Sequence, residues 1–167
     1  MKFQGMMIPN GLITHLVGLY RALQNDCSVL NESGLLLHIE KYTIQPGSFD
    51  SDLLDCRFFQ VYGDSAYGVS PYIINPYTGA DALTPQQWAW NVAMGGTWIL
   101  VEHGFSLVLQ EWPYLNCFWK HKILGNVCGL LYHVTVLLMN AHACMVPNQT
   151  LEQYSCSPPS VEEYFHA

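Results

Sequence analysis

Residues 58–67, in which an apolar and aromatic run is followed by an acid, constrain most strongly how this chain can fold. Phenylalanine, valine and tyrosine dominate its first half, a composition typical of a β-strand, and Gly63 ends the run. Asp64 therefore follows the carboxyl end of the predicted strand. Ligands and metal ions bind at this end of the strands in open α/β sheets. The run predicts an α/β fold with a carboxylate at the functional edge of its sheet.

A second acid, Glu102, lies in a segment that carries almost no other charge. A short helix is expected over residues 85–91 and a longer one over residues 96–111. Glu102 and Phe105 fall on one side of the longer helix, so Glu102 is expected to face the sheet. An acid on an inward face needs a partner or a metal ion. Asp64 and Glu102 are thus candidate ligands of a divalent metal ion, although either could be an ordinary boundary acid.

The segment ahead of the predicted Asp64 strand predicts a hairpin and a helix. Apolar runs flank Pro9-Asn10-Gly11 within residues 2–17, and Asn-Gly is a strong hairpin signal. A helix is expected over residues 25–37, with Asn25 or Asp26 as its cap. Asp26 could instead be a further carboxylate near the site, although the capping preference favours the first interpretation.

The composition limits the classes of function. Hydrophobic residues make up 50% of the chain and charged residues 11%, which indicates a single folded domain covered by its own core or by a partner. The net charge of −7 and the six basic residues argue against a nucleic-acid surface, because Lys and Arg neutralise phosphates. Six cysteines without a Cys-x-x-Cys pair or a signal peptide favour reduced thiols, and hence the nucleus or cytoplasm.

Residues 123–146 contain no Asp, Glu, Lys or Arg and are long enough to span a bilayer. However, Asn126, His133 and Asn140 recur every seven residues and draw a polar line along one helical face. A core helix can satisfy that line against its neighbours, so a buried helix is favoured and no membrane partner is expected. The polar tail, residues 147–167, is expected to dock as a surface arm through its aromatic side chains.

Short motifs follow one another along nearly the whole chain: Phe3-Gln4, Pro9-Asn10-Gly11-Leu12-Ile13, Asp26, Ser33-Gly34-Leu35, Gly63-Asp64-Ser65-Ala66-Tyr67, Asn75-Pro76-Tyr77, Asn91-Val92-Ala93-Met94, Val101-Glu102-His103-Gly104-Phe105 and Trp112-Pro113-Tyr114-Leu115. Each motif is weak alone, but their order is specific. Together they resemble the transposase domain of Harbinger-type DNA transposons, within the DDE superfamily endonucleases. The end of the chain looks like the versions in fungal elements: Pro147-Asn148-Gln149 and Pro158-Pro159-Ser160-Val161-Glu162-Glu163-Tyr164-Phe165.

The resemblance implies a ribonuclease-H-like fold, which is a mixed sheet flanked by helices, over residues 1–146. In this family an Asp, a second Asp and a Glu hold two divalent ions, Mg²⁺ or Mn²⁺, for cleavage or strand transfer at a DNA phosphodiester. By position, Asp64 matches the second Asp and Glu102 matches the Glu. The resemblance thus implies DNA as partner and the nucleus as location.

The chain also departs from the family pattern. The family's first Asp lies on a central strand just ahead of Phe3-Gln4, and the sequence from Met1 lacks it, which predicts an N-terminally truncated copy or a start placed too late. Trp98 stands where the family has Arg, and Asn25-Asp26-Cys27 replaces His-Asp-Ser. Metal binding is therefore expected to be weak and the chain inactive. The alternative is a non-catalytic interaction module whose apolar surface a protein partner covers.

Overall fold

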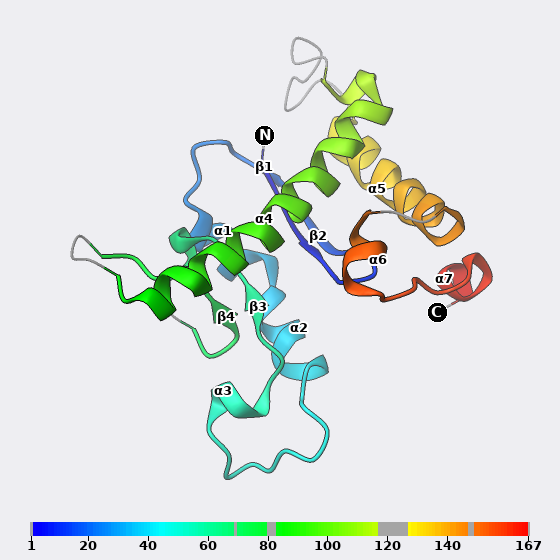
Figure 1. Ribbon diagram of the computed structural model, residues 1–167. Helices are drawn as coiled ribbons and strands as arrows, with labels where there is room; N and C mark the ends of the chain where they lie inside the picture. The colour runs from blue at the N-terminus through cyan, green and yellow to red at the C-terminus, as the bar shows by residue number, and fades with distance from the viewer. Residues whose placement is uncertain (1, 69, 80–82, 117–126, 147–148, 167) are drawn as a thin grey trace. The chain divides into compact units, whose positions relative to one another are not determined.

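The described part of the chain is a mixed α/β structure, as the sequence predicted. The computed structural model describes residues 2–68, 70–79, 83–116, 127–146 and 149–166 (Figure 1). These residues form two compact units, of which the first comprises Met1–Tyr20 with Ile99–Ala167 and the second comprises Arg21–Trp98. One long helix, α4 (Pro85–Glu111), begins in the second unit and ends in the first.

The predicted hairpin opens the first unit. Strands β1 (Lys2–Met7) and β2 (Ile13–Tyr20) pair antiparallel. In the turn, the Leu12 N–H donates a hydrogen bond to Asn10 Oδ1 at 3.1 Å. Gly11 has a φ of 84°, in the left-handed region that glycine adopts without strain. The Asn-Gly pair thus forms the turn by the chemistry expected from the sequence.

The core of the first unit forms where the hairpin meets helices. Helix α5 (Cys128–Met145) packs against β2, and the Phe3 ring stacks on the Tyr132 ring with centroids 4.3 Å apart. Val108 on α4 is completely buried. The buried cluster combines α4, α5, β2 and the short helix η2 (Pro113–Asn116), and it contains Ile13, Val108, Leu115 and Val136.

The buried Asn140 on α5 joins three parts of this unit. Its Oδ1 accepts a hydrogen bond from the Ile13 N–H at 3.0 Å, and its Nδ2 donates to the Ile13 carbonyl at 2.8 Å. The same Nδ2 lies 3.1 Å from the hydroxyl of Tyr164 on α7 (Val161–His166). This network satisfies the polar face of α5 as the sequence predicted for Asn140 and attaches the aromatic end of the chain to the core.

The second unit contains the strand predicted ahead of Asp64 in a shortened form. Strand β3 (Val61–Tyr62) pairs in parallel with β4 (Ile73–Ile74), and Phe58 forms an isolated bridge with Ile44 instead of extending β3. Helix α3 (Leu54–Arg57) precedes this segment. Among the described residues β1–β2 and β3–β4 are separate two-stranded sheets, so a single ribonuclease-H-like sheet stays a prediction.

Two helix predictions were wrong in their bounds, and glycine explains both. The helix expected over residues 25–37 is two helices, α1 (Asp26–Ser33) and α2 (Leu35–Tyr42), because Gly34 between them adopts a left-handed φ of 71° and ends α1. Conversely, the two helices expected over residues 85–91 and 96–111 are the single helix α4. Its Gly95-Gly96 pair weakens the helix by about 1 kcal/mol per glycine but leaves its hydrogen bonds intact.

Helix α4, and not the uncharged segment around α5, passes the test for a membrane span in the described part of the chain. Its length and composition suffice to cross a bilayer, and 11% of its most apolar window is buried. The sequence predicts a buried helix rather than a membrane span over residues 123–146, of which 123–126 lie outside the described residues. The core helix of a soluble protein can have the same length and composition.

The cysteines with described side chains are free thiols, which agrees with the predicted reduced state. Cys56 and Cys156 are exposed, while Cys27 and Cys144 are partly buried. Burial raises the pKa of the Cys144 thiol. A raised pKa keeps this thiol protonated and unreactive near neutral pH.

Candidate functional site

Asp64 lies where the sequence placed it, directly beyond the end of β3. The preceding Gly63 is buried, and a Cβ atom at its position would come within 2.5 Å of the Ile73 side chain. A larger residue at position 63 would therefore push the two strands apart. The close approach of β3 and β4 fixes the point from which the Asp64 side chain projects.

Asp64 is exposed, and its carboxylate caps the short helix η1 (Ser65–Tyr67). Its Oδ1 accepts hydrogen bonds from the Ala66 N–H at 3.1 Å and from the Ser65 hydroxyl at 3.0 Å. Hydrogen bonds of this kind orient a carboxylate, and ligating carboxylates in metal sites are held in the same way. One oxygen of Asp64 is thus fixed by its own turn.

The side chain of Asn75 holds the far end of this turn. Its Nδ2 donates a hydrogen bond to the carbonyl of Gly68, the residue that ends η1. Gly68 has a φ of 72°, and the Gly63 N–H donates to the Ile74 carbonyl at 3.0 Å. Residues 63–68 are therefore tied to the β4 segment at both ends.

Helix α1 brings a second carboxylate toward the same turn. The Asn25 side chain caps α1 by accepting a hydrogen bond from the Cys27 N–H at 2.8 Å, so the predicted cap is Asn25 and not Asp26. The Cys27 thiol donates to the Ala66 carbonyl of η1 at 2.7 Å. Asp26, in the first turn of α1, therefore lies beside the segment that carries Asp64.

The pKa of Tyr67 depends on the charges of both Asp26 and Asp64. Burial raises the pKa of the Tyr67 phenol, and the negative charges of Asp26, Asp64 and Cys27 raise it further, in that order. The capping preference predicted Asp26 as a helix cap, and the structure instead makes it an electrostatic neighbour of this turn. Asn25 directly precedes Asp26 and is itself a preferred N-cap residue. This was the sequence signal that Asp26 is not needed as the helix cap.

A titration of Tyr67 tests this arrangement. Replacing Asp26 with asparagine is expected to lower the Tyr67 pKa more than the same change at Asp64, because Asp26 contributes the larger charge effect. Because the folded-state pKa lies above the unfolded value of 10.0, the neutral phenol stabilises the fold below pH 10 and this contribution is lost as the pH rises above it. The measurement is the absorbance difference between each variant and its Tyr67→Phe counterpart.

An exposed acid of the same unit provides the control for this titration. Asp50 forms an ion pair with Arg57 and is not among the charges that act on Tyr67. The Asp50→Asn variant should leave the Tyr67 pKa unchanged. An unchanged pKa in the Asp26→Asn variant would show that α1 and η1 are not neighbours in solution.

Glu102 lies on the part of α4 that belongs to the first unit, and it is exposed. The expectation that it faces inward beside Phe105 was wrong, since only Phe105 packs against the buried cluster. At 3.6 residues per turn, side chains three positions apart point about 60° away from each other, which places Glu102 beyond the edge of the packed stripe. Asp64 belongs to the second unit, so each acid is placed within its own unit.

The donor chemistry fits a hard divalent cation, but neither unit holds a complete ligand set among its described residues. Carboxylate oxygens are the ligands that Mg²⁺ and Mn²⁺ prefer. Within the part of the chain that the structure describes, no group of three or more His, Cys, Asp or Glu side chains is close enough to hold a metal ion. A cation site therefore requires Asp64 to combine with ligands from outside its own turn.

In open α/β sheets ligands bind beyond the carboxyl ends of the strands, which is where Asp64 lies relative to β3. The family model of the DDE superfamily endonucleases matches residues 1–140, so this chain belongs to that family. The match supports a transposase-derived nuclease domain whose relatives generally use divalent metal ions and act on DNA. No curated protein and no solved structure matches the chain.

Proposed function

We propose that this chain is a Harbinger-type transposase domain in which Asp64 and Glu102 serve as ligands for Mg²⁺ or Mn²⁺. The observation that carries the proposal is the family match over residues 1–140, which includes both acids. The exposed, hydrogen-bonded carboxylate of Asp64 at the end of β3 supports its role. The proposed fold is ribonuclease-H-like, the proposed reaction is cleavage or strand transfer at a DNA phosphodiester, and the proposed location is the nucleus.

The residues themselves contribute position and charge. A bound divalent ion supplies Lewis-acid stabilisation of the charge that develops on the phosphate oxygens. The turn around Asp64 keeps one carboxylate oxygen in place through Ser65 and Ala66, so little ordering is needed when a ligand binds. Glu102 projects from the rigid helix α4 rather than from a loop.

The 167-residue chain by itself is expected to cleave DNA weakly or not at all. Two carboxylates, Asp64 and Glu102, are proposed as its metal ligands, and its six basic residues can neutralise few phosphates. Arg57 is engaged in an ion pair with Asp50, and Lys41 lies 4.7 Å from the centroid of the Tyr42 ring. DNA binding would thus depend on additional positive charge from a partner or from further chain.

Nicking of supercoiled plasmid tests the proposal. The family's Asp-bearing strand is fused ahead of Met1, and nicking is measured with Mg²⁺ and with Mn²⁺. The fused chain should nick DNA only with a metal ion, and Asp64→Asn or Glu102→Gln should each lower the rate about a hundredfold, because each change removes a ligand for the ion that stabilises the transferring phosphate. Asp50→Asn makes the same chemical change at an exposed acid of the second unit and should have no effect. Metal-dependent nicking that survives Asp64→Asn would contradict the proposal.

A second candidate function is a non-catalytic interaction module, which the surface of α4 favours. Trp88, Val92 and Ile99 on this helix are exposed, although each would gain from burial. A protein partner that covers these side chains would account for the low share of charged residues. Calorimetry with Mn²⁺ separates the two functions, since a pure interaction module should show no metal binding that depends on Asp64 and Glu102.

A further inference from the structure

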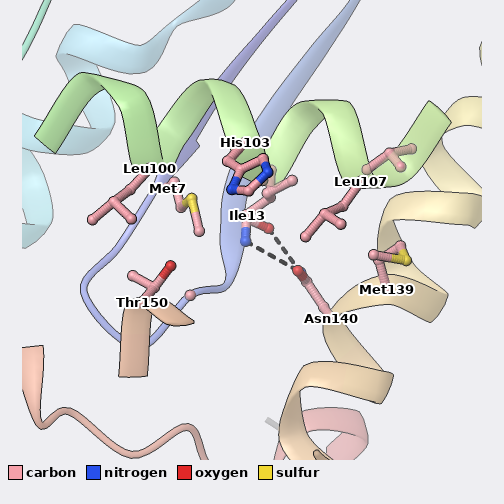
Figure 2. Close-up of a pocket in the computed structure, with 11 residues that line it drawn as sticks. Met7, Ile13, Leu100, His103, Leu107, Met139, Asn140 and Thr150 are labelled. Atoms are coloured by element: carbon pink, nitrogen blue, oxygen red, sulfur yellow. Dashed lines mark hydrogen bonds between the residues drawn. The ribbon is translucent and has the colours of Figure 1, made fainter. Parts of the chain in front are cut away.

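A cavity of about 310 Å³ lies within the first unit, between α4, the hairpin, α5 and α6 (Gln149–Tyr154) (Figure 2). Apolar side chains make up most of its lining. The residues that line it are Met7, Gly11, Ile13, Leu100, His103, Gly104, Leu107, Val108, Met139, Asn140 and Thr150. None of them belongs to the turn that carries Asp64.

The cavity has a rigid, buried floor and an exposed rim. Ile13, Val108 and Asn140 on the floor are each almost completely buried, whereas His103 and Leu107 on α4 are exposed. The paired hydrogen bonds between Asn140 and the Ile13 backbone, drawn as dashed lines in Figure 2, hold the floor together. The cavity is therefore mostly apolar, concave and open to solvent at α4, as binding sites for small molecules usually are.

Two polar groups face the cavity from opposite sides. Figure 2 shows that the Thr150 hydroxyl projects from α6 and the His103 ring from α4, with Met7 and Leu100 nearby. Thr150 is 7% exposed, so its hydroxyl lies in a nearly dry environment where a hydrogen bond to a ligand is worth most. Asn140 already uses its amide for Ile13 and Tyr164. The polar recognition therefore falls to Thr150 and His103.

We propose that this cavity binds a neutral bicyclic aromatic molecule that carries one hydroxyl group. Its volume is about twice that of a cavity of about 150 Å³ that holds benzene, which corresponds to two fused rings. The apolar lining packs against the rings, and the Thr150 hydroxyl or the His103 ring hydrogen-bonds the ligand hydroxyl. The net charge of −7 and the neighbouring Glu102 disfavour an anionic ligand at this rim.

Isothermal titration calorimetry with 2-naphthol tests the proposal on the full 167-residue chain. The expected result is one site with a Kd on the order of 0.1 mM, in line with the affinity that a ligand of this size can reach. Leu100→Trp fills the cavity and should weaken binding at least tenfold. Ile99→Trp adds the same ring at the exposed neighbouring position on α4 and should leave the Kd unchanged.

Two further variants keep the test decisive if Leu100→Trp does not fold. Leu107→Trp fills the cavity from its exposed rim, where a larger side chain is tolerated, and should weaken binding as strongly. Thr150→Val preserves the shape but removes the hydroxyl, and it should raise the Kd about fivefold. No binding of 2-naphthol at 1 mM (about ten times the expected Kd), or binding that is equal in the wild type and in Leu107→Trp, would overturn the proposal.

Discussion

Replacing Asn140 with leucine is expected to lower the free energy of unfolding by about 4 kcal/mol. Leucine has the same branched side-chain shape with four heavy atoms, but it has no polar group, so the Ile13 N–H and carbonyl lose their partners inside the core. Each unpaired buried group destabilises the fold by about 1–3 kcal/mol. Urea denaturation followed by far-UV circular dichroism measures the change.

The Tyr164→Phe variant separates the two halves of the Asn140 network. It removes only the hydroxyl on α7 and leaves both bonds to Ile13 in place, so a loss of no more than about 1 kcal/mol is expected. If Asn140→Leu were as mild as Tyr164→Phe, the amide would not be joining α5 to the hairpin. An Asn31→Leu change at an exposed position of α1 serves as the surface control.

The Gly5→Ala variant is expected to destabilise the chain by about 2 kcal/mol. A Cβ atom on Gly5 would lie 2.5 Å from the Phe105 ring, and that ring packs against the buried cluster of the first unit. Because the ring packs against this core, the strand or the ring must shift to relieve the contact, and the shift disturbs the packing of the core. Thermal and urea unfolding both report this loss.

Gly104→Ala is the matched variant for this clash. Its added Cβ atom would meet the Met7 sulfur at 2.9 Å, the flexible end of a side chain that can rotate away. Alanine also has a helix propensity about 1 kcal/mol better than that of glycine. Gly104→Ala should therefore leave the free energy of unfolding unchanged or raise it. A loss of stability equal to that of Gly5→Ala would show that the contacts of Gly5 with Phe105 and of Gly104 with Met7 do not differ as described.

Local chemistry explains which parts of the fold the sequence predicted. The Asn10-Gly11 turn, the Asn25 cap and the Gly63 strand end each depend on one or two neighbouring residues, and the structure has all three. The helix bounds that were predicted wrongly depend on whether a glycine ends a helix or lies inside one. Gly34 ends a helix, whereas Gly95-Gly96 lies inside one, and the sequence pattern around these glycines does not distinguish the two uses.

The candidate site depends on contacts that no sequence period encodes. Asp26 and Tyr67 come together only because α1 packs against η1. The orientation of Glu102 was mispredicted because apolar residues surround α4 on all sides, so periodicity defines no inward face. The family resemblance could name Asp64 and Glu102, but the residues around each acid follow from the tertiary structure.

Paramagnetic broadening by Mn²⁺ tests most directly whether Asp64 and Glu102 share one cation. Backbone amide signals are recorded by NMR during a substoichiometric Mn²⁺ titration of the isotope-labelled chain. The proposal expects the signals of Gly63, Ser65, Val101 and His103 to broaden together, and Asp64→Asn to remove the broadening at both segments. Broadening at only one segment, or broadening next to Glu102 that persists in Asp64→Asn, would contradict a shared metal site.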